Sequence, residues 1–284
     1  MLGIALALAA SAAWGSADFL GGHSARGLSP LRVAVWSKVA GGTAIGILCV
    51  AAGTLPAAEQ VPWSAAAGLV GAGALVSLYA SLAMGPMSLV APITACGAVV
   101  PVAVALVLGE LPGPVTSAGL VCAFAGALVV SREEEEAHVA LRRDTLVMAL
   151  TAALLIGAAL TFLQQAARYV PDHPGSALGI GVLQTATTVV VLGVLAAARR
   201  AGGPPPGRLG LAVATLGVLD VGANVLFATA SAKENPAAVA VLGSLYPVMT
   251  VMLARTLLGE RLSRSQTAGV AGTMLGVALI ALGQ

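Results

Sequence analysis

Apolar runs of about twenty residues recur along the whole chain, and this pattern limits the chain to a membrane fold. A helix of this length is long enough to cross the hydrocarbon core of a bilayer. A transmembrane β-strand would be about half as long and would alternate apolar with polar residues, which these runs do not. The sequence therefore predicts an all-α integral membrane protein with ten transmembrane helices. They are expected at residues 2–22, 31–53, 63–84, 87–108, 114–131, 145–167, 175–198, 209–231, 236–258 and 265–283.

The composition supports a lipid rather than an aqueous environment. Of 284 residues, 58% are apolar and 9% are charged, which leaves too little polar surface to cover a water-soluble domain. The net charge of +2 and the scattered basic residues exclude a nucleic-acid partner. The run at residues 2–22 lacks the basic segment that precedes the apolar core of a signal peptide, so we expect it to be the first helix.

The chain matches itself, without a gap, at a shift of 150 residues. The matching positions include two prolines and two Leu-Gly-Glu triplets, and chance does not readily place these at one shift. The matches pair Pro86 with Pro236, Leu108-Gly109-Glu110 with Leu258-Gly259-Glu260, Ala118-Gly119 with Ala268-Gly269, and Gly126 with Gly276. We therefore expect two homologous five-helix units, residues 1–131 and 145–284, joined by a charged linker at residues 132–144.

An odd number of helices in each unit gives the two units opposite orientations in the membrane. Inverted repeats related by an axis in the membrane plane are common in secondary transporters, because exchanging the conformations of the halves opens one site to each side in turn. The predicted fold is therefore two inverted five-helix repeats. The function that this fold favours is transport.

Several short motifs of the chain occur together in one known family. They are Trp14-Gly15-Ser16 in the first predicted helix, Gly109-Glu110 after the fourth, and Ser244-Leu245-Tyr246-Pro247, Gly259-Glu260-Arg261-Leu262 and Gly269 in the last two. Over essentially its whole length the sequence resembles the drug/metabolite transporter (DMT) superfamily, specifically its ten-helix EamA-type branch. The resemblance implies a transporter of amino acids, other metabolites or drugs, often driven by an ion gradient or by exchange. The two units depart from strict symmetry at Gly97, which aligns with Pro247.

Secondary active transport is the function that the repeats and the resemblance favour. We expect export of a small metabolite, an amino acid or a drug across the cytoplasmic membrane by alternating access. The partners are then a small-molecule substrate, a proton or another coupling ion, and membrane lipid, and no cofactor is expected. The many Ala, Gly and Val residues, with Arg in place of most Lys, point to a bacterial inner membrane.

Two other functions compete with transport. A receptor or scaffold would use the same membrane helices without flux, and a flux measurement separates it from a transporter. An intramembrane enzyme would need a nucleophile with its base, or a metal cluster, inside the membrane. The histidines lie in predicted connections and the cysteines lie apart in the apolar runs, so we expect neither an enzyme nor a metal site. These residues are His23, His138, His173, Cys49, Cys96 and Cys122.

Ionisable side chains inside a membrane are costly and are therefore functional candidates. Asp220 lies eleven residues into the predicted helix 209–231, about 16 Å along its axis and close to the bilayer midplane. Asn224 lies one turn further on the same face. This pair can bind a proton, a cation or a substrate amine, and we expect Asp220 to couple binding to the transport cycle. The competing interpretation is a hydrogen bond between helices without a ligand.

A second pair of charges is expected near the connection between the first two helices. Asp18 lies about one turn before the end of the first helix and Lys38 about two turns into the second, so their depths are similar. They are expected to neutralise each other across this hairpin, with substrate or ion binding as the alternative. Trp14 shares the face of Asp18, and Tyr79 and Tyr246 add amphipathic rings in the third and ninth helices. Substrate contact and packing are both open for these rings.

Prolines and glutamates are expected to shape individual helices. Pro92 and Pro247 each remove a backbone hydrogen bond within a predicted helix, and they are candidate hinges near the site. Glu110 and Glu260 end helices in tight connections. A carboxylate there can accept hydrogen bonds from the amides that begin the next helix, so we expect these two glutamates to be structural.

The basic residues predict an orientation in the membrane. Connections after even-numbered helices hold Arg168 and Lys233, whereas connections after odd-numbered helices, with the adjoining helix ends, hold ten arginines. The positive-inside rule therefore places the odd connections in the cytoplasm and both termini outside, although the resemblance implies cytoplasmic termini. We expect the orientation that the arginines predict. The ten are Arg26, Arg32, Arg132, Arg142, Arg143, Arg199, Arg200, Arg208, Arg261 and Arg264.

Overall fold

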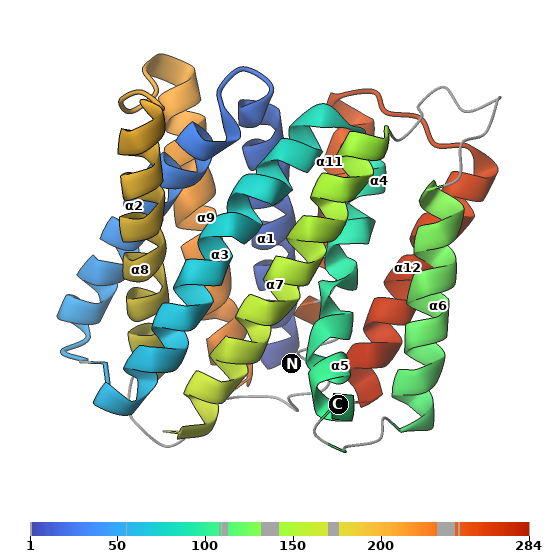
Figure 1. Cartoon of the computed structure of the whole chain (residues 1–284), viewed down its shortest axis with the longest axis horizontal. Helices are drawn as coiled ribbons and strands as arrows, with labels where there is room; N and C mark the ends of the chain where they lie inside the picture. The colour runs from blue at the N-terminus through green and yellow to red at the C-terminus, as the bar shows by residue number, and fades with distance from the viewer. Residues whose placement is uncertain are drawn as a thin grey trace.

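The computed structural model describes residues 2–54, 56–107, 109, 113–131, 142–169, 176–231, 242–243 and 245–283. Over these residues the chain forms helices and connections, and no strand. Seven of the helices in the described part are long and apolar enough to cross a membrane, and shorter apolar helices accompany them (Figure 1). The predicted all-α membrane fold is confirmed.

The described helices agree with the predicted apolar runs to within a few residues. The first half holds α1 (Leu2–Ala25), α2 (Pro30–Ala51), the 3-10 turn η1 (Ala58–Gln60), α3 (Val61–Met84), α4 (Met87–Ala95), the 3-10 turn η2 (Cys96–Ala98), α5 (Val99–Val107) and α6 (Pro114–Ser131). The second half holds α7 (Arg143–Tyr169), α8 (Ser176–Arg199), α9 (Gly207–Ser231), α11 (Tyr246–Leu257) and α12 (Arg264–Gly283). Most of the predicted linker, and part of the predicted helix 236–258, lie outside the described residues.

The fourth predicted helix, residues 87–108, is broken in the structure. α4 ends at Ala95, the turn η2 follows, and α5 begins at Val99. The break has a local cause, since Pro101 has no N–H to donate to the carbonyl of Gly97 four residues earlier. Gly97 also approaches α7 closely, because a Cβ atom there would lie 2.5 Å from the Ala153 carbonyl oxygen. The broken helix is thus held against the first helix of the other half.

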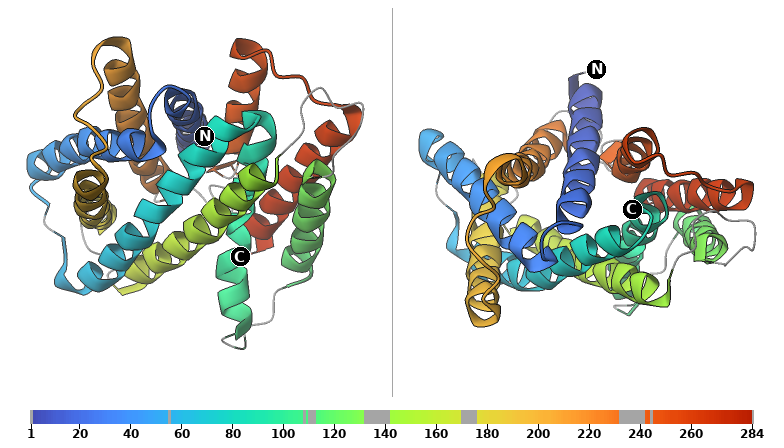
Figure 2. Two further views of the ribbon diagram at one scale, coloured as in Figure 1. Left: turned by 45° about the horizontal axis from the view of Figure 1, so that its top comes forward. Right: turned by 90° about the horizontal axis from the view of Figure 1, so that it is seen from above.

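The contacts between helices of the two halves occur in symmetry-equivalent pairs. α3 packs on α7 as α1 packs on α9, and α3 packs on α8 as α2 packs on α9. The equivalent helices α2 and α8 meet each other, and so do α6 and α12. Seen from above, α1 of the first half lies between α9 and α11 of the second half (Figure 2). Each of these contacts between the halves is therefore matched by the contact in which the halves exchange roles, as an approximate two-fold axis requires.

The two halves run in opposite directions. In Figure 1, α1 begins at the lower end of the molecule and rises, whereas its counterpart α7 begins at the upper end and descends. Both ends of the chain lie at the lower end. The predicted inverted arrangement of the repeats is confirmed.

The short helix α4 is the most enclosed element of the bundle. Every residue from Met87 to Ala95 is buried, because α4 packs on α7, α11 and α12 as well as on helices of its own half. Most of its apolar side chains belong to the main core cluster, which also includes Phe19, Leu82 and Leu216. Both halves therefore meet at α4.

Candidate functional site

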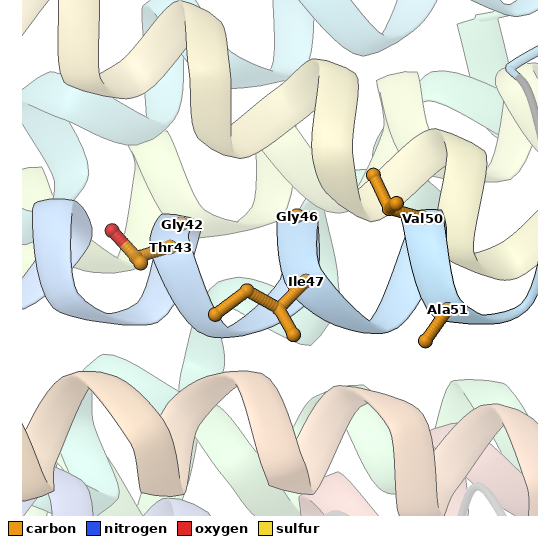
Figure 3. Close-up of a pocket in the computed structure, with 6 residues that line it drawn as sticks. All are labelled: Gly42, Thr43, Gly46, Ile47, Val50 and Ala51. Atoms are coloured by element: carbon orange, nitrogen blue, oxygen red, sulfur yellow. The ribbon is translucent and has the colours of Figure 1, made fainter.

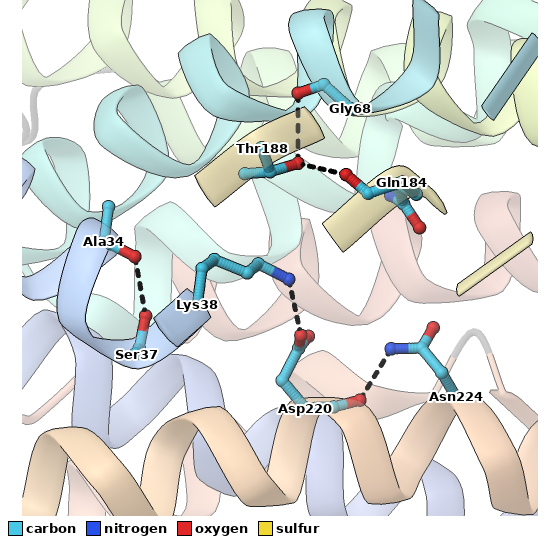
Figure 4. Close-up of polar contacts among 8 residues, drawn as sticks. All are labelled: Ala34, Ser37, Lys38, Gly68, Gln184, Thr188, Asp220 and Asn224. Atoms are coloured by element: carbon cyan, nitrogen blue, oxygen red, sulfur yellow. Dashed lines mark hydrogen bonds and ion pairs between the residues drawn. The ribbon is translucent and has the colours of Figure 1, made fainter. Parts of the chain in front are cut away.

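An ion pair joins α2 to α9 inside the bundle. The Lys38 Nζ lies 2.7 Å from Asp220 Oδ2, and the two side chains are 14% and 24% exposed (Figure 4). The predicted pair between Asp18 and Lys38 is therefore wrong. α2 packs mainly on α8 and α9 rather than on α1, its neighbour in sequence, so the ammonium group meets the carboxylate of the other half.

Small residues bring α2 and α9 close enough for this pair. A Cβ atom on Gly41 would lie 2.6 Å from the Gly217 carbonyl oxygen, so these backbones are nearly in contact. α2 is itself fixed at its start by Ser29, whose hydroxyl accepts a hydrogen bond from the Arg32 N–H, and by Pro30 in the first turn. Lys38, two turns further on, is consequently held at a fixed depth.

The two-fold counterpart of this contact carries no charge. At the shift of 150 residues Lys38 aligns with Thr188, which lies in α8. The Thr188 hydroxyl donates a hydrogen bond of 3.0 Å to the Gly68 carbonyl of α3, the helix equivalent to α9 (Figure 4). The same position thus holds an ion pair on one side of the axis and a neutral hydrogen bond on the other. The charged site is confined to the α2 and α9 side.

Asn224 lies one turn beyond Asp220 on α9. Its side-chain amide donates to the Asp220 carbonyl oxygen at 2.6 Å (Figure 4). On α9 it lies between Val221, which is buried against Gly41 of α2, and Ala223, which is also buried. Asn224 itself is exposed, so its side chain remains accessible beside the ion pair.

Asp18 adds a second carboxylate beside the ion pair. It is partly buried in α1, and none of the hydrogen bonds or ion pairs within the described part of the chain involves it. Its carboxyl group lies near Asp220 and near the hydroxyl groups of Tyr79 and Tyr246. The group formed by Asp18, Lys38 and Asp220 therefore holds two carboxylates and one ammonium.

Two tyrosine hydroxyls border this charged group. Tyr79 of α3 is buried, its ring packs against Gly21 of α1, and its hydroxyl interacts with the Ser37 side chain. Tyr246, the first residue of α11, interacts with Thr94 of α4 in the same way. Each hydroxyl can donate a hydrogen bond to a carboxylate or to a bound solute. Both tyrosines therefore present a polar group as well as an apolar ring surface.

Aromatic rings from three helices meet next to Asp18. The ring of Trp14 lies 5.3 Å from that of Phe227 and 6.4 Å from that of Tyr246, measured between centroids. Sequence reasoning did not single out Phe227. A signal was available, because Phe227 is seven residues after Asp220 and so shares the face of Asp220 and Asn224.

All seven predicted binding candidates converge on this region, from five helices of both halves. They are Trp14 and Asp18 in α1, Lys38 in α2, Tyr79 in α3, Asp220 and Asn224 in α9, and Tyr246 in α11. Ser37, Thr94 and Phe227 join them. The region lies between the two repeats, where secondary transporters of inverted-repeat construction bind their solutes.

The two candidate hinges differ in their setting. Pro92 lies inside α4, one turn before the break at η2. Pro247 lies in the first turn of α11. Leu245, which precedes this helix, has non-helical backbone angles, with φ −80° and ψ 1°. A proline in the first turn removes a donor that has no partner within the helix anyway. Pro247 therefore lies at the start of α11 within the predicted helix 236–258, and its role as a hinge stays a prediction.

Glu260 joins the two halves at the upper end of Figure 1. Its carboxylate accepts hydrogen bonds from the backbone N–H groups of Met87, at 3.0 Å, and Ser88, at 2.9 Å, and it lies 3.5 Å from the Arg26 guanidinium. We predicted a bond to the next helix along the chain. The structure shows the first turn of α4 instead, which belongs to the other half. Glu110, the sequence counterpart of Glu260, lies outside the described residues.

Two surface depressions of the described part lie on α2 and its connection to α3, away from this region. One is a shallow apolar hollow on α2, where Ile47 and Val50 are 64% and 83% exposed (Figure 3). Its only polar side chain is Thr43, whose hydroxyl donates to the Val39 carbonyl of its own helix. The hollow is a lipid-facing surface. Its lining comprises Gly42, Thr43, Gly46, Ile47, Val50 and Ala51.

The fold and the site together define a membrane transporter built from two inverted repeats, with a charged group between them. The model of the EamA-like transporter family matches residues 1–132 and again residues 145–282. The chain belongs to this family, which is part of the drug/metabolite transporter superfamily.

Structural comparison agrees with the fold. A crystal structure whose title reads "Crystal structure of protein" is similar to this chain, with a TM-score of 0.66 and 14% sequence identity. The likeness covers 98% of this chain and 95% of the other. No curated protein matches this sequence.

Proposed function

We propose that the protein exports a small metabolite, an amino acid or a drug across the cytoplasmic membrane of a bacterium, by secondary active transport without enzymatic chemistry. A proton or another ion supplies the coupling. The family establishes a multi-pass membrane transporter of the drug/metabolite type. The boundaries that we propose for its two units are residues 1–131 and 145–284, with the linker at 132–144.

The charged group of Asp18, Lys38 and Asp220 is the observation that supports this function best. Ionised side chains at membrane depth are costly, and they are retained mainly where they face a cavity or a partner. Lys38 neutralises Asp220 at 2.7 Å, while Asp18 has no partner in the described part of the chain. A carboxylate in this position needs a proton, a metal cation or the ammonium group of a solute. Binding of a cation is therefore the first step that we propose.

The packing around α4 supports alternating access. Every residue of α4 is buried, and Glu260 of the other half accepts hydrogen bonds from its first turn. Exchange of conformations between the inverted halves would open this contact between the repeats.

Flux through proteoliposomes tests the proposal. Purified protein is reconstituted, and uptake of labelled amino acids, amines and drugs is followed with and without a pH or sodium gradient. We expect at least one solute to move with the gradient. We expect Asp220→Asn to reduce this driven flux by about tenfold or more, because the variant leaves the Lys38 ammonium without its partner beside Asp18.

The matched control is Asp144→Asn. Asp144 is 71% exposed at the start of α7, and its only ion pair in the described part is with the exposed Arg142, at 3.6 Å. Such surface pairs contribute little, so this variant should transport normally. Binding of solutes without any flux would favour a receptor or scaffold over a transporter. Full driven flux in Asp220→Asn would remove this residue from the coupling step.

A further inference from the structure

The charged group between the repeats has an excess of one carboxylate. Lys38 and Asp220 neutralise each other at 2.7 Å, and the carboxylate of Asp18 remains beside them without an ion pair in the described part of the chain. An anionic solute would meet this excess unfavourably. The site is therefore complementary to a cation.

The wall beside Asp18 is aromatic. Trp14 lies one turn before Asp18 on the same face of α1, and Phe227 and Tyr246 meet it from α9 and α11. Aromatic faces attract cations and also bury the apolar part of an organic solute. A proton or a small metal ion would use the carboxylate but has no apolar body to bury against three large rings. The rings therefore favour a cation with an apolar body.

From this geometry we infer that the transported solute is an organic ammonium ion with an apolar or aromatic group. Its ammonium binds the Asp18 carboxylate, and its apolar group packs on Trp14, Phe227 and Tyr246. The Lys38 and Asp220 pair stays intact and fixes α2 against α9. This inference rests on the proposed transport function, and it narrows the solute class from any small metabolite or drug.

Equilibrium binding to the purified protein tests the inference without requiring flux. Calorimetry compares 2-phenylethylammonium with three related compounds: ethylammonium, 2-phenylethanol and phenylacetate. 2-Phenylethylammonium should bind on the order of tenfold or more tightly than the other compounds, because each of them lacks either the positive charge or the aromatic ring. Equal binding of phenylacetate would overturn the inference, and so would competition by sodium alone that is as strong as competition by the ammonium compound.

Two variants, each with a control variant, test which residues contact the ammonium and the apolar group of the solute. Asp18→Asn should weaken 2-phenylethylammonium binding by about tenfold or more, and Asp144→Asn should leave it unchanged. Trp14→Leu should reduce the advantage of 2-phenylethylammonium over ethylammonium, and Trp14→Phe should restore most of it. Unchanged affinity in folded Asp18→Asn would overturn the assignment.

The experiments distinguish failure of the proposed transport function from failure of the inferred solute class. Selective ammonium binding without flux in vesicles would remove the transport function and keep the binding site. Driven flux with no preference for ammonium compounds would keep the function and remove the inferred solute class.

Discussion

A single residue pair links the two repeats at membrane depth. Lys38 and Asp220 come from different halves, and their side chains are mostly buried, so each compensates the charge of the other. Removing one member of such a pair leaves a charge without a partner, whereas removing both leaves none. The stability of the variants should therefore not be additive.

We predict that Lys38→Met lowers the melting temperature of the detergent-purified protein more than Asp220→Asn does. Lys38→Met leaves both Asp18 and Asp220 uncompensated, at a cost of about 3 kcal/mol. The double variant Lys38→Met with Asp220→Asn should recover part of this loss. Circular dichroism or intrinsic fluorescence during heating measures the melting temperatures of the three variants. A double variant that melts at the temperature expected from adding the two single effects would contradict the coupling.

The residue scale also shows where sequence reasoning succeeded and failed. Asp18, Lys38 and Asp220 were recognisable because charges inside apolar runs are rare. Their pairing was not recognisable, because it depends on whether α2 packs on α1 or on α9. Adjacent helices in sequence were the natural assumption, yet Gly41 and Gly217 bring α2 onto α9.

At the scale of single elements, Glu260 caps a helix that is distant in sequence. Two backbone N–H groups at the start of α4 donate to one carboxylate, and the side chain is only 10% exposed. The free N–H groups and the positive end of the helix dipole both favour a negative charge there. The cap therefore holds α4 against the other half.

We predict that Glu260→Gln loosens the first turn of α4. The variant Ser88→Cys, in a protein without its native cysteines, places a thiol at a position that is buried in the structure. Weakening the cap by about 1 kcal/mol should raise the labelling rate of this thiol by a maleimide about fivefold. Glu59→Gln is the matched control, because Glu59 is exposed in the connection between α2 and α3. Equal labelling in both variants would show that Glu260 does not hold this turn.

A second prediction at this scale concerns the contact between the broken helix and α7. A Cβ atom on Gly157 would lie 2.5 Å from the Val100 Cβ and would also collide with the Gly97 carbonyl. Gly157→Ala should destabilise the protein by about 2 kcal/mol through overpacking. Gly46→Ala is the control, since nothing lies within 4 Å of its added Cβ, and the gain in helix propensity should leave stability equal or slightly higher. Thermal melting compares the two, and an equal effect would contradict the role of the close contact.

The elements themselves were predictable to different degrees. Long apolar runs located the membrane helices, because length and hydropathy are properties of the sequence alone. The break at η2 was missed, although Pro101 marks it, because prolines in membrane helices are often accommodated without a break. The role of Glu260 was half correct. A cap was expected from its position at a helix end, but its partner in α4 is set by tertiary packing.

At the scale of the whole molecule, the internal repeat was the property that could best be predicted from the sequence. The shift that aligns Pro86 with Pro236 predicted two inverted units, and the exchange of helix contacts between the halves agrees with it. The side-chain contacts are less symmetric than the fold. Lys38 has an ion pair, whereas its counterpart Thr188 has a neutral hydrogen bond, so the charge is present in one half only.

Packing at one end of the molecule brings together connections that carry many arginines. Arg26 contacts Glu260, which joins the connection after α1 to the one after α11. Arg32 donates to the Gly203 carbonyl at 2.9 Å, which joins the start of α2 to the connection between α8 and α9. Arg199, Arg200 and Arg208 flank that same connection. These basic groups therefore share one end, opposite to the chain termini in Figure 1.

We predict that this basic end faces the cytoplasm and that both termini face away from it. Short connections rich in arginine resist translocation across a membrane, and the connections at the opposite end hold only Arg168 and Lys233. Alkaline phosphatase fused after Gln284 should then be active and a green fluorescent protein fused there should be dark, since each folds on one side only. Strong fluorescence with an inactive phosphatase would reverse the orientation. It would also place the contact between Glu260 and α4 on the outer side of the membrane.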